Sequence, residues 1–182
     1  MKKLLYAALG LIICPLAVTS CGGDDTDWSD YKEWRDTNNS WYLEQQALKN
    51  PDGTPYYTEL NPSWYPESGV LIHYFNDRTK TEGNLSPMLT SKVTVKYKGS
   101  LYNGMGFDST AVAGADTVRT FSLQGVVTGW QIALSDMRVG DTCEIVLPYY
   151  MGYGSQSSGS IPPYSSLKFG IKLTDVQKYE IP

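Results

Sequence analysis

The spacing of hydrophobic residues changes once along the chain, near residue 54. Before that point, large apolar residues recur at intervals of three and seven with charged residues between them: Trp28, Tyr31, Trp34, Trp41 and Leu48. This periodicity predicts an amphipathic helix, with Asp27 or Ser29 as its N-cap and Asn50-Pro51-Asp52-Gly53 as its end. We therefore expect a helical extension over residues 27–53, and we favour packing of its tryptophans against the rest of the protein over ligand stacking.

From residue 54 onward the pattern becomes typical of β-strands. Residues 70–75 form a continuous apolar and aromatic run, and apolar and polar residues alternate over 93–98. The alternation is clearest near the end of the chain, where Leu167, Phe169, Ile171 and Leu173 alternate with Lys168, Gly170, Lys172 and Thr174. Such alternation directs one face of a strand to a core and the other to solvent. We therefore expect a curved antiparallel sheet.

One short helix interrupts the strand pattern at residues 128–140. Its apolar residues fall on one face: Trp130, Ala133, Leu134 and Met137. Thr128 with Gln131 matches a capping box, and Gly140 suits a C-terminal stop. A single helix lying across the concave side of a sheet would create a cleft with the Trp130 indole at its entrance. The predicted fold class is therefore α+β.

The N-terminus has the pattern of an export signal. Lys2 and Lys3 precede an apolar run over residues 4–18, which is shorter than the about 20 residues that a membrane span requires. Residues 18–21, Val-Thr-Ser-Cys, resemble a bacterial lipobox, which implies a lipoprotein signal over 1–20 and lipidation of Cys21. An ordinary signal that leaves a free Cys21 is the alternative. The polar, acidic residues 21–26 would then form a tether, and the protein would be lipid-anchored in the cell envelope, on a periplasmic or surface-exposed face of the outer membrane.

Charge and length indicate which partners to expect and how many domains the chain can form. The 182 residues carry a net charge of -4, and removal of the signal with its two lysines leaves 13 basic and 19 acidic side chains, about -6. With no basic stripe, we expect no nucleic-acid partner. About 160 mature residues are enough for one domain with a proper core, and we assign that domain to residues 54–182.

The cysteines and histidine point to no metal or cofactor. Cys14 lies in the signal, so Cys143 is the lone cysteine of the body and cannot form an intramolecular disulfide. Its strand-like setting favours a buried, inert thiol. A nucleophilic cysteine would need His73, the only histidine, and one His with one Cys makes a poor metal site. The Gly-x-Gly pairs at 104–106 and 152–154 lack the spacing of phosphate-binding loops.

Three segments in order resemble the FKBP family of peptidyl-prolyl cis/trans isomerases. The first signature is similar to Val93–Gly99 with Leu101–Gly104 and Phe107–Thr110; the second to Phe121–Trp130, continuing to Leu134, Met137 and Gly140; the third to Tyr153-Gly154, Ile161-Pro162-Pro163 and Leu167–Leu173. Together these segments cover roughly residues 90–175. The resemblance implies a half-open antiparallel β-sheet wrapped around one short helix, preceded by the N-terminal helical extension.

The resemblance also implies a single apolar pocket. Its residues would be Tyr97, Phe107, Asp108, Val126, Val127, Trp130, Tyr153, Ile161 and Phe169, with Phe121 as a possible further wall. Trp130 would be the floor, and the Val127 amide would donate to a substrate carbonyl. Without the resemblance, Phe107 and Asp108 would also fit a core anchor and a turn-capping acid. The sequence departs from the family pattern in three places: Ser160 replaces an aliphatic residue, the 155–160 loop at the rim is short, and Gly170 replaces an acidic residue in the last strand.

An apolar pocket suits prolyl isomerisation. The barrier to rotation about an X-Pro bond is about 20 kcal/mol, and the twisted imide is less polarised than the planar one, so an aromatic environment favours it. No nucleophile, metal or cofactor is needed. The expected partners are proline-containing polypeptides of the envelope, and macrolide inhibitors such as the family binds. The alternatives are a non-catalytic peptide-binding chaperone that uses the same cleft, and a glycan-binding lipoprotein with a row of exposed aromatics.

Overall fold

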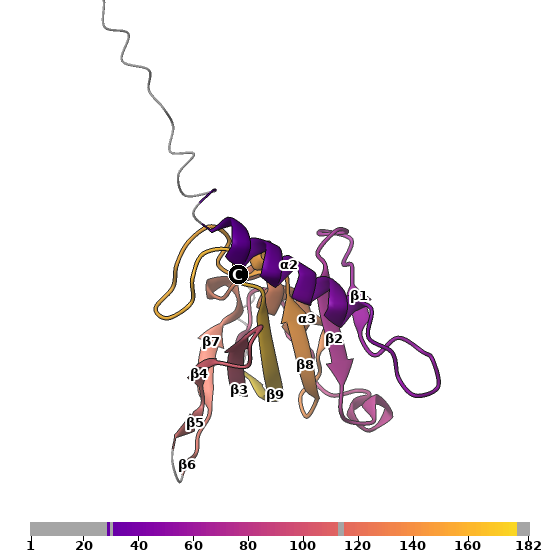
Figure 1. Cartoon of the computed structure of the whole chain (residues 1–182). Helices are drawn as coiled ribbons and strands as arrows, with labels where there is room; N and C mark the ends of the chain where they lie inside the picture. Colours follow the sequence, from indigo (N-terminus) through magenta and orange to yellow (C-terminus); the bar gives the residue numbers. More distant parts are fainter. Residues whose placement is uncertain (1–28, 30, 113–114, 178–182) are drawn as a thin grey trace, which may run out of the picture.

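The computed structural model describes residues 29, 31–112 and 115–177, so the predicted signal, Cys21, the tether and Asp27 lie outside the described residues. Figure 1 shows the arrangement of the elements. In chain order they are α2 (Lys32–Gln46), β1 (Thr58–Leu60), β2 (Val70–Tyr74), η1 (Arg78–Thr81), β3 (Lys92–Leu101), β4 (Gly106–Ser109), β5 (Ala111–Val112), β6 (Ala115–Asp116), β7 (Arg119–Ser122), η2 (Leu123–Gly125), α3 (Thr128–Asp136), β8 (Thr142–Leu147), η3 (Tyr149–Met151) and β9 (Leu167–Gln177).

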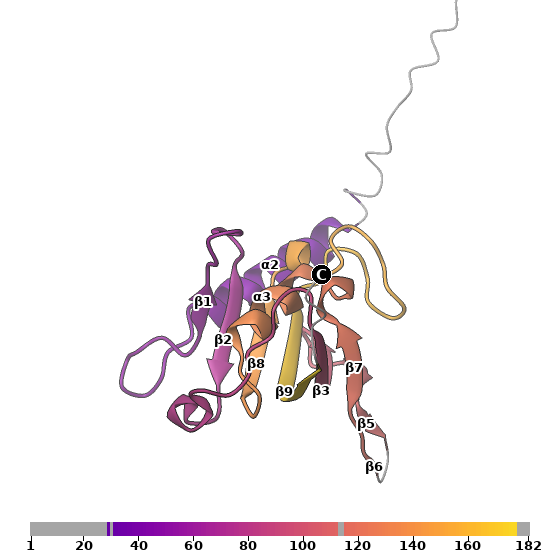
Figure 2. The same cartoon turned by 180° about the vertical axis from the view of Figure 1, so that it is seen from behind.

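The described residues form a seven-stranded antiparallel sheet in the order β1-β2-β8-β9-β3-β4, with β7 also paired to β3. The long central strands β3 and β9 pair from Lys92 opposite Gln177 to Leu101 opposite Leu167. Burial alternates along both strands, as the sequence pattern predicted. The α+β class and the curved antiparallel sheet with one helix against it are confirmed (Figure 2).

Helix α3 packs on the concave face of this sheet and closes the core. Trp130, Ala133, Leu134 and Met137 are buried in it, as the sequence predicted. Gly129 is required at the contact, because a Cβ there would lie 2.5 Å from Leu147 Cδ2 on β8. A larger residue at this position would push the helix off the sheet.

The predicted ends of α3 need correction. Its N-cap is Val127, with no side-chain cap hydrogen bond, so the expected capping box from Thr128 is absent. Gln131 instead donates from its amide nitrogen to the Val126 carbonyl at 2.9 Å. The helix ends at Asp136, before Gly140, which lies in the turn into β8 with a φ of 99°. Gly140 is therefore needed for that turn and not for the helix stop.

Helix α2 covers the opposite face of the sheet at one end (Figures 1 and 2). Trp41 and Tyr42 pack there on a second buried cluster that includes Leu71 and Val146, so the preference for tryptophans that pack on the domain is supported. The helix begins at Lys32 with Tyr31 as N-cap, not Ser29, and makes no side-chain cap bond. It ends at Gln46, four residues earlier than the predicted stop.

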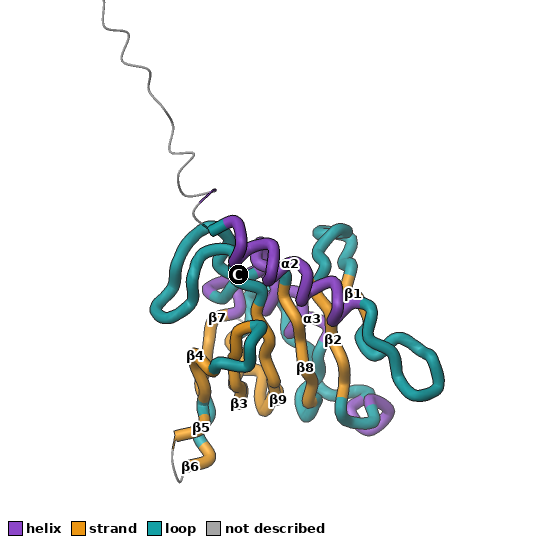
Figure 3. The backbone as a smooth tube through the Cα atoms, viewed as in Figure 1, coloured by secondary structure: helices purple, strands orange, loops and turns teal. Residues whose placement is uncertain are grey.

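No helix among the described residues is long and apolar enough to cross a membrane. The tube in Figure 3 shows that the connection between β8 and β9 runs next to the beginning of α2. This β8–β9 connection contains η3 and then runs as loop to Leu167. It carries Tyr153 and Ile161, two residues that the sequence predicted to line a pocket.

Candidate active site

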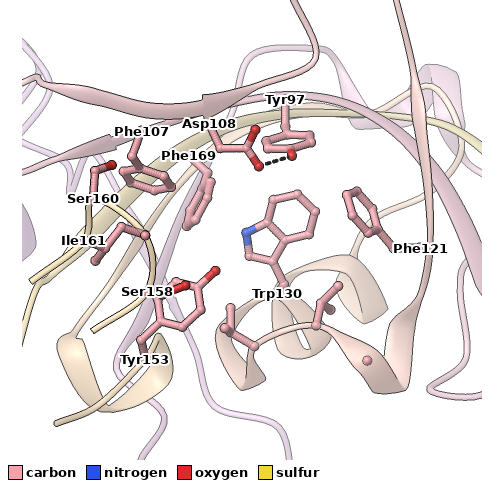
Figure 4. Close-up of a pocket in the computed structure, with 14 residues that line it drawn as sticks. Tyr97, Phe107, Asp108, Phe121, Trp130, Tyr153, Ser158, Ser160, Ile161 and Phe169 are labelled. Carbon is pink, nitrogen blue, oxygen red and sulfur yellow. Dashed lines mark hydrogen bonds between the residues drawn. The ribbon is translucent and has the colours of Figure 1, made fainter. Parts of the chain in front are cut away.

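An open pocket of about 400 Å³ lies between α3 and the concave face of the sheet (Figure 4). Residues from widely separated segments line it: Tyr97, Phe107, Asp108, Phe121, Gly125, Val126, Val127, Trp130, Tyr153, Ser158, Gly159, Ser160, Ile161 and Phe169. The structure thus brings together all nine predicted pocket residues and Phe121, the possible tenth. The four additional lining residues lie beside predicted ones in the chain.

The floor of the pocket is the indole of Trp130, which projects from the first turn of α3. Three rings meet it edge to face: Tyr97 at 5.1 Å, Phe169 at 5.2 Å and Phe121 at 5.8 Å between ring centroids. Perpendicular aromatic pairs at these distances are favourable beyond their area of contact. The indole is therefore fixed from three sides, and only 4% of the residue remains exposed.

Phe107 and Phe169 form one wall. Their rings lie edge to face at 5.4 Å. The close approach of this wall to the sheet depends on Gly99 of β3, because a Cβ there would lie 2.6 Å from the Phe107 ring and 2.8 Å from the Phe169 ring. Gly99 therefore contributes to the shape of the pocket, although it is not one of the lining residues.

Asp108, the residue after Phe107 on β4, makes one edge of the pocket polar. Its Oδ2 accepts a hydrogen bond from the Tyr97 hydroxyl at 2.5 Å (Figure 4), and its Oδ1 accepts the Ser109 amide at 2.8 Å. Burial, and then the hydrogen bond to Asp108, raise the pKa of Tyr97 to about 12. The phenol consequently stays protonated and keeps donating throughout the neutral range.

Arg119 completes this polar cluster, and sequence reasoning missed it. Its Nη1 donates to the Tyr97 hydroxyl at 2.9 Å and to Asp108 Oδ1 at 3.1 Å. The residue lies on β7, where it stands opposite Val95 of β3. The available signal was a basic residue two positions before Phe121: alternation along a strand puts both side chains on the same face.

The N-terminus of α3 opens toward the pocket through Val126 and Val127. The Val127 carbonyl accepts the first hydrogen bonds of the helix, from the Trp130 and Gln131 amides. Within the described part of the chain, the Val127 amide itself donates to no protein acceptor. It is thus available to a carbonyl group in the pocket, as the family resemblance implied.

The rim is made by the loop that follows Tyr153. Tyr153 is 38% exposed, and Ser158 and Ile161 exchange backbone hydrogen bonds at 3.0 and 2.9 Å, which close a tight turn with Gly159 at a φ of 57°. Ser160 lines the pocket within that turn. The rim is consequently more polar than the floor, because a hydroxyl lies where the resemblance led us to expect an aliphatic side chain.

The other chemically active groups lie elsewhere. Cys143 is fully buried in β8, and burial raises the pKa of its thiol, which keeps it protonated and inert. His73 stacks on Tyr56 with a centroid distance of 3.9 Å, and its Nδ1 lies 2.7 Å from the Tyr56 carbonyl. Among the described residues, no group of three or more His, Cys, Asp or Glu side chains is placed to hold a metal ion.

A curved antiparallel sheet closed by one short helix, with an aromatic-floored pocket between them, defines the FKBP class of protein. Residues 83–174 match the family model described as FKBP-type peptidyl-prolyl cis-trans isomerase. The chain belongs to this family and is an FKBP-type peptidyl-prolyl cis-trans isomerase. The family and the activity predicted from the three sequence segments are thereby confirmed.

Two curated relatives show how far the similarity extends. The macrophage infectivity potentiator of Trypanosoma cruzi is 30% identical over 97% of this chain and 84% of its own length. The peptidyl-prolyl cis-trans isomerase Mip of Coxiella burnetii is 43% identical, over 51% of this chain and 40% of its own length. The chain thus spans less than half of the Coxiella protein.

Solved structures share the fold. The isomerase of Pseudomonas syringae superimposes with a TM-score of 0.65 over 81% of this chain and 96% of its own, at 24% identity. FkpA of Escherichia coli gives a TM-score of 0.67 over 84% of this chain and 65% of its own, also at 24% identity. At this identity the likeness concerns the fold alone.

Proposed function

We propose that this chain accelerates rotation about X-Pro bonds in exported or envelope proteins, in the pocket between α3 and the sheet. The observation that carries the proposal is the Trp130 floor fixed by three aromatic edges inside an open cavity of about 400 Å³. Small-molecule sites have cavities of this order, lined mainly by apolar and aromatic residues, so the pocket has room for a prolyl ring and its flanking peptide groups.

The mechanism is differential solvation of the peptide bond. In the planar imide, resonance places charge on nitrogen and oxygen, and rotation removes that resonance. Transfer from water into a pocket lined by Trp130, Phe107 and Phe169 costs the polarised planar form more than the twisted form. Each tenfold gain in rate requires only about 1.4 kcal/mol of such a difference. No bond to the protein is made or broken in this step.

The polar groups at the pocket edges would hold the substrate backbone. In the proposed arrangement the prolyl ring rests on Trp130, and the Val127 amide donates to the carbonyl that is exposed as the bond turns. The Tyr153 hydroxyl and the Asp108 carboxylate bind the flanking peptide groups. Val126 and Ile161 cover the ring from the sides. With Tyr97, Phe107 and Phe169 as the walls, the nine pocket residues predicted from the sequence would form one binding site.

A protease-coupled assay on a short X-Pro peptide tests the proposal. The purified chain should increase the rate of cis-to-trans conversion above the spontaneous rate, in proportion to its concentration. A folded protein that binds the peptide without any acceleration would instead support the alternative, a chaperone that uses the same cleft. Folding is checked in the same sample by circular dichroism.

We also propose that the enzyme works from a lipid anchor on Cys21, in the cell envelope. The supporting pattern is the lysine pair, the apolar run and the Val-Thr-Ser-Cys sequence at residues 18–21. In a bacterial host that processes lipoproteins, Cys21→Ser should move the protein from the membrane pellet to the soluble fraction. An unchanged membrane fraction would exclude Cys21 as the anchor.

Macrolide binding is the remaining proposal for this pocket. Its aromatic floor and walls suit a ring-shaped apolar ligand, and the polar Ser160 at the rim reduces the apolar contact available there. We therefore expect a macrolide to inhibit the coupled assay. We expect Ser160→Ile to strengthen that inhibition.

A further inference from the structure

The segment between the pocket and the last strand has no regular secondary structure. We call residues 161–166 the rim segment: it begins with Ile161, which lines the pocket, and ends at Ser166, just before β9 starts at Leu167. Its conformation therefore depends on contacts made with other parts of the chain. Those contacts come largely from α2, which lies outside residues 83–174 that match the family model.

Two side chains of α2 bind the rim segment directly. Trp34 Nε1 donates to Ser165 Oγ at 3.1 Å, and Ser165 Oγ donates in turn to the Pro162 carbonyl at 2.7 Å. One turn further along the helix, Asn38 Oδ1 accepts the Ser166 amide at 2.9 Å. The chain of bonds from Trp34 thus ends one residue from Ile161.

The polar groups that join α2 to the rim segment are buried. Asn38 is fully buried on a helix that is otherwise mostly polar, and its amide nitrogen donates to the Trp34 carbonyl at 2.8 Å. Ser165 and Ser166 are also buried. A buried polar group that loses its partner is costly, so each bond strongly favours one position of the rim segment.

Tyr164, in the middle of the rim segment, has a strained backbone. Its φ is 59°, which is unfavourable for a bulky side chain. The ring is held against Tyr149 at 5.6 Å and against Tyr31 at 6.2 Å, with the Arg35 guanidinium 5.8 Å above it. The Tyr164 amide donates to the Gly154 carbonyl at 2.8 Å, beside Tyr153 of the pocket.

We propose that α2 is a positioning element of the isomerase site: Trp34 and Asn38 hold the rim segment so that Ile161 and Tyr153 reach the pocket. This inference rests on the function proposed above and adds a role for the N-terminal extension. Neither Trp34 nor Asn38 lines the pocket, so both act through Ser165 and Ser166 and through the strained backbone at Tyr164 that precedes them. Loss of either link lets the rim segment relax and weakens the grip on the peptide.

The test compares two conservative variants of the same helix in the full chain. Trp34→Phe keeps an aromatic ring but removes the donor to Ser165. Tyr42→Phe is the matched control, since it removes the donor from the Tyr42 hydroxyl to the Gly69 carbonyl at 2.6 Å, away from the rim segment. We expect Trp34→Phe to lower kcat/KM and peptide affinity by about three- to tenfold, and Tyr42→Phe to change neither by more than about twofold.

Two further readouts separate positioning from simple destabilisation. Ser165→Ala removes the other half of the link, so the double variant with Trp34→Phe should lose no more affinity than Ser165→Ala alone. The NMR shift of the Ile161 δ1 methyl should move in Trp34→Phe and not in Tyr42→Phe. Equal activity, affinity and Ile161 shift in the two single variants would overturn the inference. If the wild type itself gave no acceleration, the proposed function would fail, while affinity and the Ile161 shift would still decide the role of α2.

Discussion

At the scale of single residues, the polar edge of the pocket depends on one carboxylate with several donors. Asp108 accepts from the Tyr97 hydroxyl and the Ser109 amide, and Arg119 forms an ion pair with it at 3.1 Å. The Asp108 side chain is 44% exposed and that of Arg119 50%. Exposed ion pairs contribute little to stability, so this cluster has more effect on where the Tyr97 hydroxyl points than on the folding free energy.

Asp108→Ala should therefore lower turnover and leave the fold largely intact. Without the carboxylate, the Tyr97 hydroxyl keeps Arg119 as its neighbour but has no acceptor at 2.5 Å, and one anchor for the peptide backbone is lost. We expect kcat/KM to fall about tenfold, which corresponds to about 1.4 kcal/mol of transition-state stabilisation.

The coupled assay and thermal unfolding check this prediction together. Asp108→Asn is the matched control, because it keeps an acceptor oxygen toward Tyr97 and should retain more activity than Asp108→Ala. An Asp108→Ala protein that is unfolded would show that the residue is structural. Full activity in a folded Asp108→Ala protein would remove Asp108 from the site.

The sequence predicted the apolar pocket residues better than the polar ones. Trp130, Phe107 and Phe169 stood at positions that matched a spaced signature, so three weak patterns in order sufficed to place them together. Arg119 belongs to no such signature, because its role comes from the pairing of β7 with β3 and not from its neighbours in the chain. The burial of Asn38 was missed for a similar reason: a polar residue on an amphipathic helix is normally assigned to the solvent face.

At the scale of elements, the pocket wall depends on how closely β3 approaches the aromatic rings. Gly99 of β3 stands opposite Phe169 of β9, while the neighbouring pair is Lys98 and Gly170. A Cβ at Gly99 would collide with Phe107 and Phe169, whereas a Cβ at Gly170 would have no heavy atom within 4 Å. The two glycines belong to neighbouring residue pairs of the sheet, but only Gly170 has room for a larger side chain.

Gly99→Ala should destabilise the protein and weaken peptide binding, because the rings of the wall must shift. Overpacking of this kind costs about 1–3 kcal/mol. Gly170→Ala is the matched control and should leave peptide affinity unchanged, with a change in stability below about 1 kcal/mol. Urea unfolding and peptide titration measure both effects. Equal losses of stability and peptide affinity in the two variants would contradict the claim that the pocket wall depends on a glycine at position 99.

Element positions were predictable from periodicity, and element ends were not. The strands at 70–75, 93–98 and 167–174 and the helix at 128 lie where alternation and helical spacing placed them. Both helices, however, begin at residues whose side chains make no cap bond. Their starts are set by packing on the sheet, which local sequence rules do not describe.

At the scale of the whole molecule, one end of the sheet is covered on both faces, by α3 on the pocket side and α2 on the other (Figure 1). Several tyrosines become buried or half-buried in this packing. Burial is the main cause that raises the pKa values of Tyr42, Tyr57 and Tyr74, and it raises the pKa of Tyr97 to about 12. Because their pKa values are raised in the folded state, these tyrosines make the free energy of unfolding depend on pH in the alkaline range.

The free energy of unfolding should fall as the pH rises above about 10, the pKa of tyrosine in an unfolded chain. Below that value the buried tyrosines are protonated in both states and their contribution is fully present. Above it the unfolded chain releases protons that the folded chain retains, and the contribution of Tyr97 is lost as the pH approaches about 12.

Urea unfolding at about pH 8 and about pH 11 measures this loss, and absorbance near 295 nm follows the tyrosinate that forms. Tyr97→Phe should reduce the difference in unfolding free energy between the two pH values, because it removes one of the raised groups. A free energy of unfolding that stays constant across this range would contradict the burial of these hydroxyls.

The most direct test of the central claim is exchange NMR on an X-Pro peptide with a catalytic amount of the folded chain. The same spectra report binding, through shifts of the peptide signals, and rotation, through cross-peaks between the cis and trans forms. We predict cross-peaks that the peptide alone does not show on this timescale, and weaker cross-peaks with Asp108→Ala. Shifted peptide signals without cross-peaks, from folded protein, would contradict the claim that this pocket lowers the barrier to X-Pro rotation.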